Sequence, residues 1–432
     1  MQKTNVSLDW MTRAAVLTCN RRASTFGFDN GHAKMSETRR PGCVLMGCLA
    51  LDSGLRDTAR GPRSIRMKIH IPRFATLTVA IILLTMAGAQ ALAQSSGASL
   101  TGTQQETMAQ STEWTDISPS WLQSTSPCQI TFQPGTPGRI LLGTCTEGLC
   151  FSSDHGATWS REYSDFFIDV GIPSWWIRDV IFNPGNPQEA LAVTMSGSYW
   201  SDNGGHSWLR HQGSMMPTSA HMLTNSPDGT YAFASEYFGS LFRYDWNAMA
   251  WDNELVVHYG MGLYGISFDR SSPARLYMGS EFYDAAVSID MGQSFFSFSE
   301  GLPGPAIPMV ADPEVPDRVL AASGSNIYVK PELKSRRPVW FLHSSGLPGT
   351  TVLSLIHDPR DPNRMFAGTV DEGVHYSLDR GATWQPLTRK GLDHLSVVDL
   401  AINPEKPGWL LAAGHSGGPA SGGLFKIRLL RP

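Results

Sequence analysis

The sequence has few charged residues and few cysteines, and both deficits exclude classes of protein. Only 17% of the 432 residues are charged, and the formal net charge is −4. No dense run of Lys and Arg occurs after residue 100, so we expect no nucleic-acid partner. The cysteines after residue 93 are Cys128, Cys145 and Cys150, and they lack the paired spacing of a zinc site. We therefore expect no metal and no cofactor.

The sequence also lacks an apolar run long enough to cross a membrane. The longest apolar run, at 75–89, follows the basic residues Lys68 and Arg73 and precedes the small residues at 91–93. A membrane anchor needs about 20 apolar residues, whereas a basic start, a shorter apolar run and a small-residue site are typical of a cleaved signal peptide. We therefore expect residues 67–93 to direct export, which gives a secreted or periplasmic protein without a membrane span.

The segments on either side of this signal peptide have no periodic pattern. Residues 1–66 are predicted to be a disordered extension or to lie upstream of the true start. Residues 94–110 are polar and predict a flexible leader. The globular part is therefore expected at 111–432.

Glycine and proline, in contrast, are abundant, and one short polar motif recurs. Gly occurs 42 times and Pro 28 times, as in chains of many short strands joined by tight turns. The motif "SSDHGATW" at 152–159 returns as "SDNGGHSW" at 201–208, "SIDMGQSF" at 288–295 and "SLDRGATW" at 377–384. We call these four segments the polar boxes. Such recurrence predicts a repeat architecture.

Each polar box lies in a longer unit of four expected strands. Units begin near residues 130, 180, 223, 266, 309, 355 and 400, and those at 223 and 309 lack a box. The seventh unit ends one strand short, and the Trp-led segment "STEWTDIS" at 111–118 can supply that strand. The sequence therefore predicts an all-β, seven-bladed β-propeller closed by its N-terminal strand, because closure removes an exposed sheet edge.

The boxes and their spacing resemble the Asp-box, or BNR repeat, of sialidases, two-propeller xyloglucanases, the sortilin luminal domain and a photosystem assembly factor family. The resemblance implies a propeller and leaves the function open, because these families share little beyond the scaffold. It also implies that each box is a structural turn between the third and fourth strands. The box residues expected to form these turns are Ser152, Asp154, Gly156, Trp159, Ser201, Asn203, Gly205, Trp208, Ser288, Asp290, Gly292, Phe295, Ser377, Asp379, Gly381 and Trp384.

The opposite face is then the place to look for function, because ligands of propellers gather around the channel on that side. Its second-to-third turns and inter-blade segments carry acids, aromatics and a few histidines, including His221 and His394. The expected binding residues are Trp175, Trp176, Arg178, Tyr237, Phe238, Phe282, Tyr283 and His415. Aromatic rings beside acids suit a sugar or a protein surface.

Two functions remain open from the sequence. The first is a non-catalytic, monomeric module that binds a carbohydrate or protein ligand. The alternative is a glycoside hydrolase or lyase, which needs a pair of carboxyl groups; the candidates are Glu236, Glu281, Asp284 and Asp371. A sialidase is not expected, because its arginine segment ahead of the first blade has no counterpart. Cys145 and Cys150 flank a short turn and are predicted to face each other as a disulfide, with Cys128 as a competing partner.

Overall fold

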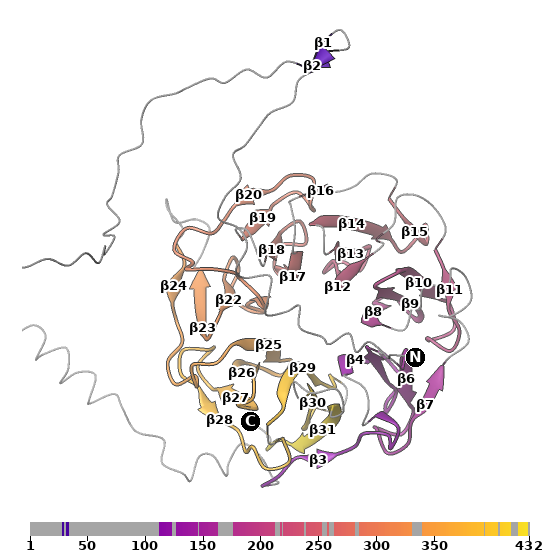
Figure 1. Ribbon diagram of the computed structural model, residues 1–432, viewed down its shortest axis with the longest axis vertical. Coiled ribbons are helices and arrows are strands. Elements are labelled where there is room, and N and C mark those ends of the chain that lie inside the picture. Colours follow the sequence, from indigo (N-terminus) through magenta and orange to yellow (C-terminus); the bar gives the residue numbers. More distant parts are fainter. Residues whose placement is uncertain are drawn as a thin grey trace, which may run out of the picture. The chain divides into compact units, whose positions relative to one another are not determined.

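Seven antiparallel sheets follow one another along the chain in the computed structural model, and they form the blades of a β-propeller (Figure 1). The structure describes residues 28–29, 32–33, 112–122, 127–145, 147–162, 176–211, 217, 219–236, 239–252, 257–258, 263–280, 285–330, 339–392, 394–404, 407–415 and 422–430. The chain divides into two units, Met1–Ala89 and Gln90–Pro432. In the first unit β1 (Phe28–Asp29) pairs with β2 (His32–Ala33).

The second unit contains the propeller. Blade 1 is β4 (Pro127–Phe132), β5 (Ile140–Thr144), β6 (Leu149–Ser152) and β7 (Ser160–Glu162); blade 2 is β8 (Ile177–Asn183), β9 (Asn186–Thr194), β10 (Gly197–Ser201) and β11 (Leu209–Arg210). Blade 3 is β12 (Ala220–Asn225), β13 (Tyr231–Glu236), β14 (Ser240–Asp245) and β15 (Ala250–Trp251), and β16 (Val257–His258) also pairs with β14. Blade 4 is β17 (Leu263–Phe268), β18 (Leu276–Ser280), β19 (Ala286–Ser288) and β20 (Phe296–Ser297).

The remaining blades complete the ring. Blade 5 is β21 (Met309–Ala311), β22 (Val319–Ser323), β23 (Asn326–Lys330) and β24 (Phe341–Leu342); blade 6 is β25 (Val352–Asp358), β26 (Asp361–Thr369), β27 (Val374–Ser377) and β28 (Gln385–Pro386). Blade 7 is β29 (Ser396–Ile402), β30 (Trp409–His415) and β31 (Gly422–Arg428), and its fourth strand is β3 (Thr115–Asp116). The predicted seven blades and the predicted closure by the N-terminal strand are both confirmed.

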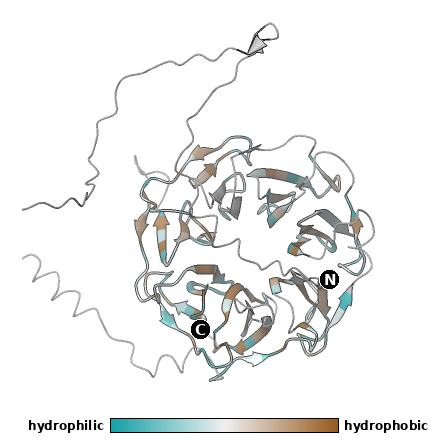
Figure 2. Cartoon of the chain, in the orientation of Figure 1, coloured by the Kyte–Doolittle hydropathy of each residue, from teal (hydrophilic) through white to brown (hydrophobic). Residues whose placement is uncertain are grey.

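The hydrophobic core lies between neighbouring blades rather than in one central mass. The second strands are the most buried, and all five residues of β5 and of β22 are buried. The short fourth strands β3, β20 and β24 are exposed. Figure 2 shows the same gradient, with hydrophobic colour on the inner strands and hydrophilic colour on outer strands such as β7 and β28.

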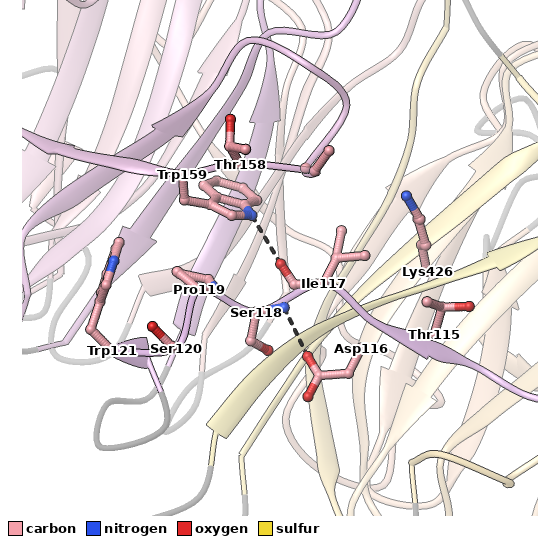
Figure 3. Close-up of a pocket in the computed structure, with 12 residues that line it drawn as sticks. Thr115, Asp116, Ile117, Ser118, Pro119, Ser120, Trp121, Thr158, Trp159 and Lys426 are labelled. Atoms are coloured by element: carbon pink, nitrogen blue, oxygen red, sulfur yellow. Dashed lines mark hydrogen bonds between the residues drawn. The ribbon is translucent and has the colours of Figure 1, made fainter.

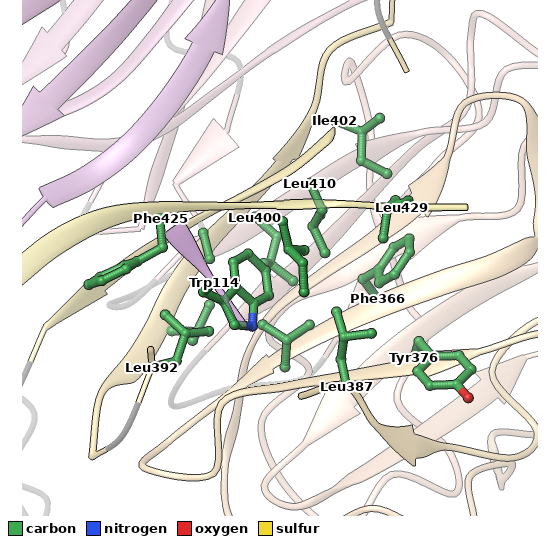
Figure 4. Close-up of a cluster of buried hydrophobic side chains, with 14 residues drawn as sticks. Trp114, Phe366, Tyr376, Leu387, Leu392, Leu400, Ile402, Leu410, Phe425 and Leu429 are labelled. Carbon is green, nitrogen blue, oxygen red and sulfur yellow. The ribbon is translucent and has the colours of Figure 1, made fainter. Parts of the chain in front are cut away.

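An aromatic side chain just before or within each fourth strand packs against the preceding blade. The cluster between blades 6 and 7 shows how: Trp114 is 4% exposed, packs among Phe366 and Leu400, and donates from Nε1 to the backbone oxygen of Thr388 at 2.8 Å (Figure 4). The seven aromatics, in blade order from 1 to 7, are Trp159, Trp208, Trp251, Phe295, Trp340, Trp384 and Trp114. The N-terminal segment therefore supplies both the strand and the aromatic that blade 7 lacks.

The polar boxes occupy the hairpin between the third and fourth strands. In each box the Ser hydroxyl donates to the Asp or Asn side chain and accepts from the Gly amide; for Ser377 both bonds, to Asp379 and from Gly381, are 2.8 Å. The residue before that Gly is left-handed in every copy, at φ 60, 71, 59 and 58°. Its amide donates to a backbone oxygen in the first-to-second turn or at the start of the second strand of the same blade, as from Arg380 to Asn363 in β26.

These bonds fix which loops share a face. The boxes and the first-to-second turns lie on one face, which we call the box face. The second-to-third turns and the starts of the inner strands lie on the other, which we call the channel face.

Candidate functional site

The inner strands share an irregularity on the channel face. Six of the seven inner strands described have a β-bulge near their first residue, where the strand register skips one residue. A bulge bends the strand and redirects a side chain. The residues skipped by the register are Cys128, Arg178, His221, Tyr264, Leu353 and Val398, on blades 1, 2, 3, 4, 6 and 7. The inner strands surround the centre of the ring (Figure 1), so the bulges form a ring around the channel mouth.

Blades 2 and 3 bring an arginine and a histidine of this ring into contact. Arg178 donates from Nη2 to Nδ1 of His221 at 2.5 Å. Burial, and then the charge of Arg178, lower the pKa of His221 to about 3, so the imidazole is neutral and can accept this bond. The guanidinium carbon of Arg178 also lies 4.7 Å from the centre of the Trp176 ring. Among the described residues, no Asp or Glu forms an ion pair with Arg178.

Cys128 belongs to the same ring of bulged residues. It is hydrogen-bonded to Cys145, which was expected to pair with Cys150. Cys150 pairs across the β5–β6 hairpin with Leu142, three residues before Cys145, so the two side chains leave opposite faces of the sheet. The predicted Cys145–Cys150 disulfide is not formed in the structure. Cys145 is instead hydrogen-bonded to Cys128, and none of the three cysteines is in a disulfide.

Just below the ring lie polar side chains that bind the next blade. Asp399 of blade 7 accepts from the amide of Ile130 at 2.8 Å, and Gln129 of blade 1 accepts from the amide of Val180 at 3.3 Å. These side chains follow the bulge in their strands, as does Asp179 in blade 2. Burial raises the pKa of Asp179 to about 8 and that of Asp399 to about 7. Asp179 and Asp399 are therefore acids with raised pKa values, and their carboxyl oxygens accept hydrogen bonds from backbone amides.

The carboxylates expected from the sequence are only partly within the described residues. Glu236, at the end of β13, is 5% exposed and accepts from the amide of Ser219 at 3.2 Å through Oε1. Asp371 follows β26, has a φ of 56° and accepts from the Ser396 hydroxyl at 3.0 Å. Glu236 therefore bonds the residue just before β12 of its own blade, and Asp371 bonds the first residue of β29 in the next blade. Glu281 and Asp284 lie outside the described residues.

The expected aromatic residues divide in the same way. Trp176 directly precedes β8 and contacts Arg178. His415 ends β30, opposite Ser396 and Gly422. The other expected binding residues, Trp175, Tyr237, Phe238, Phe282 and Tyr283, lie outside the described residues. Of the predicted site, the structure thus brings together Trp176 and Arg178, and adds His221 and Cys128 to them.

A separate pocket of about 450 Å³ lies where the N-terminal strand closes the ring (Figure 3). Its walls are the segment 115–121, the polar box of blade 1 and Lys426. Trp159 donates from Nε1 to the backbone oxygen of Ile117 at 2.9 Å, and the Ser118 amide donates to Asp116 at 2.8 Å. The bond from Trp159 attaches the closing segment to blade 1, the bond from Ser118 lies within that segment, and the pocket includes none of the channel-mouth residues.

The described residues contain no group of three or more His, Cys, Asp and Glu side chains placed to hold a metal ion. In that same part of the chain, no helix is long and apolar enough to cross a membrane.

Known proteins resemble this chain in structure alone. No family model and no curated protein matches its sequence. YCF48 from Cyanidioschyzon merolae is 13% identical, with a TM-score of 0.57 over 73% of this chain and 99% of its own. A structure of YCF48 bound to D1 peptide is 16% identical, with a TM-score of 0.54 over 74% of this chain and 95% of that one. The extracellular domain of BT3049 from B. thetaiotaomicron is 13% identical, with a TM-score of 0.53 over 70% of this chain and 40% of that one. At these identities the likeness establishes a β-propeller fold and no more.

Proposed function

We propose that this protein is a non-catalytic binding module that holds a carboxylate-bearing ligand at the channel mouth. The observation that carries the proposal is the contact of Arg178 with neutral His221 and with Trp176 in the ring of bulged residues. A guanidinium binds a carboxylate through two parallel hydrogen bonds. His221 orients the guanidinium without neutralising it, and the indole ring offers an apolar wall beside it.

Of the two ligand classes, a peptide is the one we favour. One of the propellers of similar fold is described with a bound peptide, which supports the use of such a scaffold for a peptide chain. A carbohydrate is the other class, and an acidic sugar would present the same carboxylate. The resemblance of the polar boxes to Asp-box repeats is compatible with either ligand, because those families bind both.

Hydrolysis is less well supported by the described acids. Glu236 accepts from the Ser219 amide, and Asp371 accepts from the Ser396 hydroxyl of the next blade. Asp179 has the raised pKa of a general acid, but both of its oxygens accept backbone amides. A general acid must reach its substrate within hydrogen-bond distance, and a side chain held in this way does not.

Peptide and oligosaccharide arrays test the proposal directly. The full chain is applied to synthetic peptides with free or amidated C-termini, and to neutral and uronic-acid oligosaccharides. We expect retention of peptides with a free carboxylate, and at least tenfold weaker binding by Arg178→Ala. Arg428→Ala is the matched control, because Arg428 is exposed at the end of β31 on the box face. Equal weakening by both variants, or retention of neutral sugars only, would refute the proposal.

We further propose that the protein is exported after cleavage near Gln94 and acts as a monomer. The supporting observation is the basic, apolar and small-residue order of residues 67–93. N-terminal sequencing of the secreted chain, together with its mass in solution, tests both statements.

A further inference from the structure

Cys128 and Cys145 lie on neighbouring strands at the channel end of blade 1. Pro127 pairs with Thr144; Cys128 is the bulged residue after Pro127, and Cys145 follows Thr144. Residues placed in this way are diagonal neighbours on one face of an antiparallel sheet, about 7–8 Å apart in a regular ladder. The bulge frees Cys128 from that spacing, and the two side chains are hydrogen-bonded to each other. They are therefore close enough to react after a small adjustment, since a disulfide needs Cα atoms roughly 4.4–6.8 Å apart.

The pKa values of Cys128 and Cys145 are shifted in opposite directions, and the third cysteine, Cys150, takes no part in their hydrogen bond. The hydrogen bond from Cys128 lowers the pKa of Cys145 and raises that of Cys128, so Cys145 forms its thiolate more readily than Cys128 does. Thiolates are the species that attack disulfides. Cys150 is fully buried, and burial raises the pKa of its thiol. It is therefore a poor nucleophile and a suitable internal control.

We propose that Cys128 and Cys145 form a reversible disulfide when the protein meets a disulfide oxidant. The Cys145 thiolate attacks one sulfur of the oxidant and displaces its other half as a thiolate. The Cys128 thiol then loses its proton and attacks Cys145, which forms the intramolecular bond and releases the second thiol. Counting the proton that the Cys145 thiol gives up when it forms its thiolate, the protein loses two electrons and two protons, and the two halves of the oxidant gain both. This reaction does not depend on the proposed ligand.

The cross-link would tie the bulge of β4 to the end of β5 beside Arg178. Arg178 interacts electrostatically with both sulfurs in the reduced protein. Oxidation removes the thiolate and fixes the bulged residue, so the bond would stiffen one side of the channel mouth.

Peptide mapping of the full chain tests the proposal. The protein is treated with glutathione disulfide, free thiols are alkylated in denaturant, and trypsin with a glutamate-specific protease cuts the chain. Cleavage after Glu113, Arg139 and Glu147 places each cysteine of blade 1 on a separate peptide. We expect a mass for peptide 114–139 joined to 140–147, its loss on treatment with dithiothreitol, and full alkylation of Cys150.

Two variants make the result decisive. Cys150→Ala should form the same linked peptide, whereas Cys145→Ser should not. The oxidised wild type should also melt several degrees higher than the reduced protein, because a cross-link restricts the unfolded chain, and Cys145→Ser should show no such difference. Complete alkylation of Cys128 and Cys145 after oxidation, or linkage of Cys128 to any other cysteine, would overturn the proposal.

Discussion

The carboxylate of Asp179, on the inner strand of blade 2, accepts a hydrogen bond of 2.7 Å from the backbone amide of Leu223 on the inner strand of blade 3. Asp399 of blade 7 makes the equivalent bond to Ile130 of blade 1 at 2.8 Å. Each bond joins two blades next to the channel, where the sheets are nearest one another. The ring is thus held at its centre by buried acids as well as by the aromatic residues farther out.

These acids should make stability depend on pH. The pKa of Asp179 is about 8 in the folded protein, against an ordinary value of 3.8 for the same side chain in an unfolded chain, so between those limits the folded state keeps a proton that the unfolded chain has released. Stability is therefore greatest at the acid end of this window, falls as the pH rises from about 4 to 8, and levels off above it. The midpoint temperature of thermal unfolding, measured at several pH values across this range, should decrease as the pH rises. Each unit of pKa shift corresponds to about 1.4 kcal/mol in the free energy of unfolding.

Asp179→Asn should flatten that dependence, since the amide retains an acceptor for Leu223 and carries no charge. Asp228→Asn is the control: hydrogen bonds outweigh the slight burial of Asp228 and lower its pKa, so its own contribution changes only at more acidic pH. If both variants keep the slope of the wild type, Asp179 is not the titrating group.

The polar box of blade 6 offers a graded test of the turn. Asp379 accepts from the amide and the hydroxyl of Thr383, at 2.8 and 2.6 Å, and from Ser377. Asp379→Ala removes all three acceptor bonds and should lower the free energy of unfolding by about 1–2 kcal/mol. Asp379→Asn should cost less, because Asn203 occupies this position in blade 2, where it accepts from the Ser207 amide and donates from Nδ2 to the Ser207 hydroxyl. Chemical denaturation measures both, and equal losses would contradict this account.

The number and closure of the blades could be predicted from the sequence because each unit repeats a local pattern of strands and turns. The boxless units could be placed as well, since Trp251 and Trp340 keep the aromatic that leads the fourth strand. A short polar motif with glycine specifies its turn locally, so it can be read without knowledge of the rest of the chain.

The channel mouth could not be predicted in the same detail. A bulge shifts the ladder by one residue and leaves the apolar pattern of the strand almost unchanged, so the sequence does not reveal that Cys128, Arg178 and His221 share a ring. The same limitation explains the error over Cys145 and Cys150. Their spacing suggested a hairpin pair, but pairing depends on the register, which the turn sets.

Trp384→Ala should destabilise the interface between blades 5 and 6. Trp384 is 3% exposed, packs against Leu320 and Met365, and donates from Nε1 to the Gly381 oxygen at 2.8 Å. Removal of so large a buried side chain costs about 3–5 kcal/mol. Trp159→Ala should cost less, because Trp159 is only half-buried at the closure of the ring. Unfolding free energies from denaturant titration compare the two, and a larger loss for Trp159→Ala would show that the closure carries more of the stability than the interior blades.

Glu236 allows a structural role to be separated from a catalytic one. The side chain is buried, and its Oε1 accepts from the amide of Ser219 at 3.2 Å. Glu236→Gln keeps an acceptor of the same shape and should unfold like the wild type, whereas Glu236→Ala leaves a buried amide unpaired and should lose about 1–3 kcal/mol. A catalytic acid behaves differently, since Gln cannot donate or accept a proton in its place and turnover falls by orders of magnitude. Denaturation curves and a polysaccharide-hydrolysis assay on all three proteins distinguish the cases: hydrolysis by the wild type that Glu236→Gln abolishes without loss of stability would replace the binding module with a glycoside hydrolase.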